Sequence, residues 1–244
     1  MPTLLNIFDP RLDKPYRYEF KYRVPTYLRA VLVSEFEQMG FKDDPFMRPD
    51  KFYFVTSIYF DTFAHADWTD KAGGYGERKK VRVRIYREQL TDETPEIWLE
   101  IKHKNDVRVF KEKTLLTRKQ WRDFPNLAAG NDPVLAKALY YIFREQRRPT
   151  ALVRYKRRIF LYDLAGFDVR FTFDYDLEAC QSDTFGYNAM TKVAPGDCVL
   201  EVKFDRFLPA WFGFIVKKFN LRRDTFSKYA LALETLRKFN PLPR

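Results

Sequence analysis

Charged and apolar residues alternate strictly in four segments of the chain. Val81-Arg82-Val83-Arg84-Ile85 is the clearest, and the same scheme recurs over 17–22, 97–102 and 199–204. Side chains alternate across a β-strand, so each segment would have one apolar face and one row of Arg, Lys or Glu. An ordinary surface strand carries a mixed polar face, whereas these rows are mostly charged and mostly positive. The pattern predicts a sheet curled around a charged interior that holds a strongly anionic ligand.

Together with these four segments, the hydrophobic and polar patterns of the chain predict eight strands and six helices. Strands are predicted over 17–24, 52–60, 79–88, 96–104, 107–116, 151–163, 167–177 and 198–204. Helices are predicted over 26–39, 63–71, a short stretch after Thr117, 133–147, 209–219 and 225–239. Short turns at Asn105-Asp106 and Ala165-Gly166 join neighbouring strands, which predicts antiparallel pairing. No repeat or linker divides the chain. We therefore expect one α+β domain over residues 1–244, with a core of about 16–240 and an antiparallel closed β-barrel with flanking helices.

Composition narrows the class of protein. Aromatic residues make up 18% of the chain, which excludes general disorder, and the net charge of +11 favours an anionic partner without selecting one. The only cysteines, Cys180 and Cys198, form no CxxC pair, so we expect neither a zinc site nor a disulfide framework, in a reduced cytosolic setting. With only His65 and His103, catalysis would depend on carboxylates, cations, tyrosines or a metal bound by oxygen ligands. No signal peptide and no membrane-spanning segment is predicted.

Arg82 and Arg84 lie two residues apart on one predicted face, about 7 Å from each other by the rise of a strand. That spacing is close to the repeat of an extended phosphate chain. One guanidinium group can bind two phosphate oxygens at once. A solvated strand face is the alternative for any single strand. Because the charged row repeats on four strands, phosphate binding is the favoured interpretation.

Glutamate precedes lysine by two residues on three of these strands. The pairs are Glu19 with Lys21, Glu100 with Lys102, and Glu201 with Lys203. Each carboxylate is either a charge partner of the lysine or a ligand for Mg²⁺ or Mn²⁺, and the sequence favours neither. Lys111 and Lys113 share a face of the 107–116 strand, and Tyr155 shares a face with Arg157, although periodicity alone does not orient these two strands.

Seven segments together resemble a known family. In chain order they are 17–22 (RYEFKY), 57–62 (SIYFDT), 80–86 (KVRVRIY), 99–102 (LEIK), 170–174 (RFTFD), 199–203 (VLEVK) and 226–229 (FSKY). They resemble the polyphosphate-polymerase domain of the vacuolar transporter chaperone family, within the triphosphate tunnel metalloenzymes. The resemblance covers about residues 16–230.

This resemblance implies a basic tunnel barrel that binds ATP and a divalent metal, Mn²⁺ or Mg²⁺, and transfers the γ-phosphoryl group to a growing polyphosphate chain with release of ADP. The implied phosphate-binding tunnel residues are Lys21, Arg82, Arg84, Lys102, Arg157, Arg170, Lys203 and Lys228, of which all except Lys21 and Arg170 are assigned to catalysis. Lys71, Lys111 and Lys113 join the substrate-binding set by spacing, and Tyr155 and Ser227 join it as hydroxyl contacts. Glu201 is the implied metal ligand, with Glu19 and Glu100 as helpers.

Two other functions remain open. A hydrolase of the same fold would need several glutamates for two metals, whereas these rows hold more Lys and Arg than Glu. A non-catalytic binder of polyphosphate or RNA would expose aromatic residues beside basic ones. The polymerase interpretation predicts no nucleic-acid partner, inward cations, and aromatics on the outer face beneath helices. Eukaryotic members add a phosphoinositol-sensing domain and membrane helices, and neither is predicted here. We expect a stand-alone prokaryotic domain in the cytoplasm that reaches the inner face of a membrane only through a partner.

Overall fold

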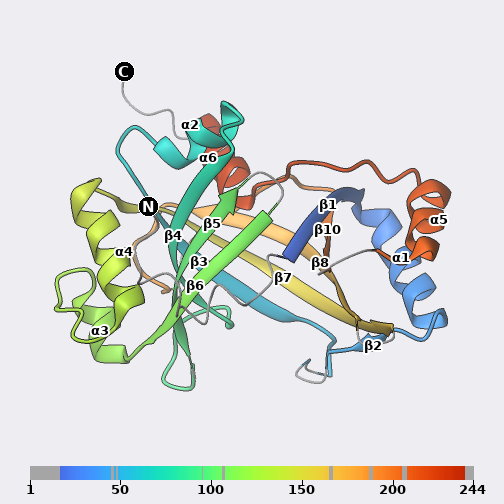
Figure 1. Ribbon diagram of the computed structural model, residues 1–244, viewed down its shortest axis with the longest axis horizontal. Helices are drawn as coiled ribbons and strands as arrows, with labels where there is room; N and C mark the ends of the chain where they lie inside the picture. The colour runs from blue at the N-terminus through green and yellow to red at the C-terminus, as the bar shows by residue number, and fades with distance from the viewer. Residues whose placement is uncertain are drawn as a thin grey trace, which may run out of the picture.

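A curled antiparallel sheet forms the centre of the computed structural model (Figure 1), which describes residues 17–44, 47, 49–94, 96–105, 108–164, 167–186, 189–204 and 208–239. Its eight long strands are β1 (Arg17–Pro25), β3 (Tyr53–Asp61), β4 (Glu77–Ile85), β5 (Ile97–Asn105), β6 (Arg108–Leu116), β7 (Arg148–Leu164), β8 (Phe167–Cys180) and β10 (Asp197–Phe204). Two short strands that the sequence did not predict, β2 (Lys42–Asp43) and β9 (Thr191–Lys192), extend it. The predicted turns at Asp106 and at Ala165-Gly166 lie outside the described residues, as does the segment before residue 17.

The sheet curls back on itself but stays open along one seam. The strand order is β2-β7-β3-β4-β5-β6-β1-β10-β8-β9, and β7 also pairs with β8. β1 pairs with β10 from Tyr18 to Pro25, whereas only Arg17 and Tyr18 of β1 pair with β6. Because β1 leaves β6 after these two residues, the structure is an open half-barrel rather than the closed barrel that was predicted. The α+β class and the antiparallel pairing are confirmed.

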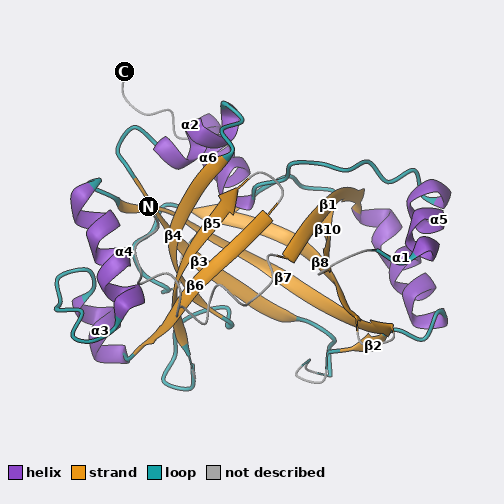
Figure 2. Cartoon of the chain, in the orientation of Figure 1, coloured by secondary structure: helices purple, strands orange, loops and turns teal. Residues whose placement is uncertain are grey.

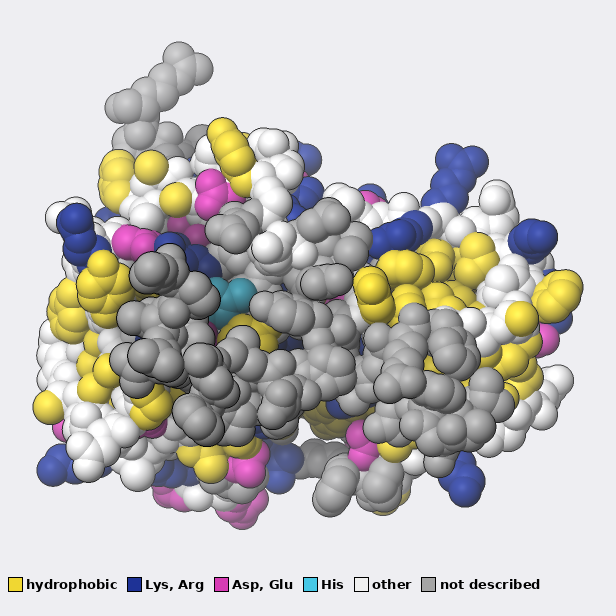
Figure 3. Space-filling model, viewed as in Figure 1, with side chains coloured by type: hydrophobic (Ala, Val, Ile, Leu, Met, Phe, Trp, Pro, Cys, Tyr) yellow, Lys and Arg dark blue, Asp and Glu magenta, His cyan; other side chains and the backbone are white. Residues whose placement is uncertain are grey.

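Within the described residues, six helices accompany the sheet (Figure 2). They are α1 (Thr26–Gln38), α2 (Ala66–Ala72), α3 (Arg118–Asp123), α4 (Pro133–Arg144), α5 (Ala210–Lys218) and α6 (Lys228–Phe239). In the same view, hydrophobic side chains gather on the side of the molecule that carries α1 and α5 (Figure 3). The carboxylate of Asp132 accepts hydrogen bonds from the first backbone N–H groups of α4, and Thr117 begins α3 with a capping box. These caps explain why both helices begin where the sequence predicted. Among the described residues, the helices are too short or too polar to cross a membrane.

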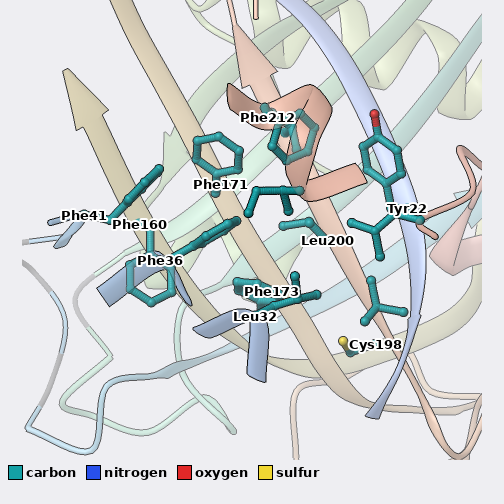
Figure 4. Close-up of a cluster of buried hydrophobic side chains, with 14 of the residues drawn as sticks. Tyr22, Leu32, Phe36, Phe41, Phe160, Phe171, Phe173, Cys198, Leu200 and Phe212 are labelled. Carbon is teal, nitrogen blue, oxygen red and sulfur yellow. The ribbon is translucent and has the colours of Figure 1, made fainter. Parts of the chain in front are cut away.

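Two helical layers cover the outer face of the sheet. Phe36 of α1 packs against Phe171 and Phe173 of β8, and Phe212 of α5 joins the same cluster (Figure 4). On the other side, Leu135 and its neighbours on α4 pack against the apolar residues of β3, β4 and β5. These outward apolar residues alternate with the charged ones, so burying them turns the charged rows toward the concave face.

The last helix, α6, lies on the concave face of the sheet. The sequence predicted this helix, but only as one of the flanking helices. Leu233 and Leu236 of α6 pack against Ala151 and Val153 of β7 and against Ala179 of β8. The ring of Tyr229, at the start of this helix, stacks at 5.1 Å on the ring of Tyr59. The expectation that aromatics lie on the outer face beneath helices therefore holds for the Phe36 cluster but not for Tyr59 and Tyr229. Part of the concave face is apolar and is covered by α6.

Candidate functional site

The inward residues of the sheet border a cavity of about 380 Å³. Its lining contains thirteen Lys and Arg residues, namely Lys21, Lys71, Arg78, Lys80, Arg82, Arg84, Lys102, Lys104, Lys111, Arg157, Lys203, Arg223 and Lys228. Of the described residues in this lining, three carry carboxylates, namely Glu19, Glu201 and Asp224. This excess of fixed positive charge suits a ligand with several negative charges. The cations were predicted to face inward, and those that line the cavity do so.

Strand β4 supplies four of these cations. Arg78, Lys80, Arg82 and Arg84 occupy alternate positions and line the cavity, while Val81 and its apolar neighbours are buried on the opposite face. The sequence interpretation assigned roles to Arg82 and Arg84 only. Arg78 and Lys80 share their alternation, so the signal that finds them was present in the sequence.

Arg82 forms an ion pair with Glu100 in the middle of this row, in which two of its nitrogens share one carboxylate oxygen. Its Nε and Nη2 atoms donate to Oε2 of Glu100 at 2.7 and 2.5 Å, and its Nη1 donates to the hydroxyl of Tyr59 at 3.0 Å. Arg84 lies 3.9 Å from the same carboxylate. Burial raises the pKa of Glu100, but Arg82 and Arg84 outweigh it and hold the pKa below its ordinary value. Glu100 is thus placed as a charge partner of two arginines, and it does not line the cavity.

Strands β1 and β10 bring two Glu-Lys pairs into one network with β5. Glu19 lies 2.9 Å from Lys21 and 3.2 Å from Lys102, and Glu201 lies 2.5 Å from Lys203. Lys203 also lies 3.9 Å from Glu19 and so connects the two carboxylates. Burial raises the pKa of each carboxylate, yet the surrounding lysines lower both pKa values well below the usual range. Both glutamates are therefore ionised at neutral pH.

Asp174 of β8 is another buried carboxylate, to which the sequence interpretation assigned no role. It accepts hydrogen bonds from Nε and Nη2 of Arg157 at 2.6 and 2.7 Å, and Nζ of Lys228 lies 2.6 Å away. Arg157 also donates to the hydroxyl of Tyr155 at 3.3 Å, which confirms that these two residues share the inward face. A phosphate ligand would compete with Asp174 for both cations.

The segment leading into α6 passes along the cavity. Lys21 donates to the backbone carbonyl of Phe226 at 3.1 Å, and Lys80 donates to the hydroxyl of Ser227 at 3.1 Å. These contacts, together with the Tyr229 hydroxyl donating to buried Asp61 at 2.5 Å, place Ser227 and Lys228 beside the cations of the sheet. The predicted helix 225–239 consequently begins three residues later, at Lys228.

The surroundings of Lys80, Lys102 and Tyr59 in the cavity lower the pKa of each. Burial lowers the pKa of Lys80 to about 8 and that of Lys102 to about 8. For Tyr59, burial raises the pKa, but Arg82 and Arg84 outweigh it and lower the pKa to about 7. The positive charge of the cavity therefore decreases as pH rises above neutrality.

Three predicted residues do not line the cavity. Glu100 is held by Arg82, as described above. Nζ of Lys113 lies 4.0 Å from the ring centroid of Trp98, toward the other end of β5. Arg170 is the register partner of Lys203 on the inward face, and its buried Nε has no hydrogen-bond acceptor within the part of the chain that the structure describes. The structure brings together the other thirteen predicted residues, and what each does there stays a prediction.

Few groups in the cavity could hold a metal ion. Nowhere in the described ranges do three or more His, Cys, Asp or Glu residues gather in a way that could hold a metal. Glu19 and Glu201, however, are both ionised and both lie within 4 Å of Lys203. Mg²⁺ is commonly held by one or two carboxylates while substrate phosphates and water complete its coordination. The two glutamates fit a metal that arrives with a phosphate ligand.

Solved structures that are similar to the chain include proteins from three organisms. The PH1819 protein of Pyrococcus horikoshii is 14% identical, covers 90% of this chain and 99% of its own, and has a TM-score of 0.49. A candidate adenylate cyclase from Bacillus halodurans is 11% identical over 86% of this chain and 95% of its own, with a TM-score of 0.47. Another from Vibrio parahaemolyticus is 14% identical over 89% and 97%, with a TM-score of 0.46.

No curated protein sequence matches the chain. The model of one protein family, described as the VTC domain, matches residues 16–237. This match covers every described strand and the cavity between them, and all but the last residues of α6. The chain belongs to the VTC-domain family.

Proposed function

We propose that this protein is a polyphosphate polymerase, which transfers the γ-phosphoryl group of ATP to the end of a polyphosphate chain and releases ADP. The observation that supports it is the cavity lined by thirteen cations against three carboxylates. Membership of the VTC-domain family points to phosphate compounds as ligands. In this proposal nucleotide enters the curled sheet at one mouth and polymer leaves at the other.

The residues of the cavity match what the reaction requires. Phosphoryl transfer needs little covalent chemistry from the protein, because alignment and charge stabilisation supply most of the acceleration. An oxygen of the terminal phosphate of the chain attacks the γ-phosphorus, and the bond to the bridging oxygen breaks as ADP leaves. Arg82, Arg84 and Arg157 would hold phosphate oxygens in pairs, and Lys228 with Ser227 would contact them from the opposite side.

Glu201, assisted by Glu19, would hold the divalent metal. Bound with the phosphates, Mn²⁺ or Mg²⁺ would neutralise part of their charge. Lys203 and Lys21 contact these carboxylates and would fix their orientation before the metal arrives. Glu100 has a weaker claim to this role, because both of its bonds at 2.7 Å or less are made to Arg82.

Incubation of the purified protein with ATP and Mn²⁺, followed by gel electrophoresis of the products, tests the proposal. Polymer together with ADP is the expected result. Inorganic phosphate without polymer would instead support the hydrolase, and salt-sensitive binding of RNA without turnover would support the binder. Arg82→Met and Arg122→Met form a matched pair for this assay. Arg122 lies on α3, apart from the cavity, so only the first substitution should abolish the polymer.

A further inference from the structure

Resting on the proposed function, a further inference concerns the two ends of the concave surface, which differ in chemistry. Along β4 the inward residues run from Arg78 and Lys80 through Arg82 and Arg84 to Tyr86. β5 is antiparallel to β4, and its inward row passes alongside from Lys104 and Lys102 through Glu100 to Trp98. Both rows therefore change from cations to aromatic rings in the same direction. Figure 1 shows α2 and α6 near the cationic end of these strands.

The aromatic end contains three rings that keep part of their surface exposed. The rings of Tyr53 and Tyr86 meet edge to face, with centroids 5.8 Å apart, and Trp98 is the register partner of Arg84. Tyr53, Tyr86 and Trp98 are all half-buried. Two cations stand beside them, because Lys113 lies 4.0 Å from the Trp98 ring centroid and Arg84 lies 5.9 Å from that of Tyr86. This end combines accessible rings with charges that attract an anionic molecule.

The cationic end has no comparable ring among the described residues that line the cavity. Tyr59, Tyr155, Phe226 and Tyr229 line it, but each is at most 6% exposed. Their faces are covered by α6 and the strands, as in the stacking of Tyr229 on Tyr59. Lys71, Arg78 and Arg223 also lie there. The lining at this end can hold phosphates, but its own rings offer little surface to a flat neutral base; Tyr75, which is 61% exposed, lies just before β4 and outside that lining.

ATP and polyphosphate differ in whether they carry a flat ring that could use the aromatic end. Both carry a row of phosphates, but only ATP carries a planar base, and bases stack on aromatic side chains whatever their sequence. We infer that Tyr53, Tyr86 and Trp98, which lie beyond Arg84 and outside the lining of the cavity, form its nucleoside-binding mouth, with Lys113 beside them. The triphosphate then extends from this mouth toward Arg82, and the polyphosphate chain occupies the end lined by Lys71 and Arg78.

Calorimetric titration with ATP and with tripolyphosphate, which lacks a nucleoside, tests this inference. For Trp98→Ala the Kd for ATP should rise by roughly five- to hundredfold, the range that stacking of one base supports. The Kd for tripolyphosphate should stay within about twofold of the wild-type value. Trp98→Phe keeps a ring and should restore most of the ATP affinity. Lys71→Met, at the opposite end, should weaken long-chain polyphosphate more than ATP, because the triphosphate of ATP extends only toward Arg82.

Tryptophan fluorescence gives a second readout that does not depend on affinity. ATP should change the wild-type emission, tripolyphosphate should change it much less, and Trp98→Phe should remove the ATP-specific change. If Trp98→Ala weakens both ligands equally, or neither, the inference is overturned while the phosphate site stands. If wild-type protein binds neither ligand, the proposed function fails and the inference fails with it. Tyr86→Leu repeats the comparison should Trp98→Ala not fold.

Discussion

The ion pair between Arg82 and Glu100 allows the charge arrangement of the cavity to be tested quantitatively. The two side chains are 8% and 4% exposed, and they share two hydrogen bonds. Arg82→Met leaves Glu100 buried with more distant cations, of which Arg84 lies at 3.9 Å. Glu100→Gln leaves the guanidinium of Arg82 with Tyr59 as its remaining partner. Each single substitution thus leaves a buried charge without its main counter-charge.

Breaking a buried ion pair from one side typically costs about 3–5 kcal/mol of unfolding free energy. The double variant removes both charges, so we expect it to be more stable than the sum of the single effects predicts, with a coupling free energy of about 3 kcal/mol. Urea unfolding of the four proteins measures this, provided that the slopes stay equal. A coupling below about 0.5 kcal/mol would refute the pairing.

The same variants separate two roles for Glu100. Arg82→Met removes a charged donor and should weaken tripolyphosphate binding by about 1.5–3 kcal/mol, or roughly ten- to hundredfold. Glu100→Gln removes a negative charge beside Arg82 and Arg84, so tripolyphosphate should bind at least as tightly as to wild type. A selective loss of Mn²⁺ dependence in Glu100→Gln would instead make Glu100 a metal ligand and refute its assignment as a charge partner.

Three further predictions concern the metal, the pH dependence and the start of α6. Glu201→Gln should abolish Mn²⁺-dependent turnover while the circular dichroism spectrum stays unchanged, and wild-type turnover would remove Glu201 from the metal role. Tripolyphosphate affinity should fall between about pH 7 and pH 9, because Lys80 and Lys102, each with a pKa of about 8, lose positive charge as pH rises. Lys102→Arg stays charged and should flatten that decline in titrations across this range; an unchanged profile would contradict the assignment. Tyr229→Phe removes the hydroxyl that donates to buried Asp61. It should lower the free energy of unfolding by about 1–3 kcal/mol, measured in urea, and raise the KM for ATP. Wild-type values of both quantities would exclude a positioning role for this hydroxyl.

The sequence by itself determined which face of the clearest strand, β4, turns toward the cavity. A strand places alternate side chains on opposite faces, and an apolar row such as Val81 and Val83 must be buried against helices. Arg82 and Arg84, at the alternate positions, must then point to the opposite face, toward the cavity. Caps such as Asp132 are equally local, which is why most helices begin close to their predicted positions.

Only the tertiary structure decided how these elements meet. Asp174 lies between Arg157 and Lys228, residues that are far apart along the chain, and no local pattern joins them. The open seam at Tyr18 depends on where β1 departs from β6, and the place of α6 on the concave face depends on the apolar patch around Val153. Alternation states which face a side chain takes, because it is a property of one strand. Register, closure and choice of partner depend on contacts between distant segments, and these form only when the whole sheet is assembled.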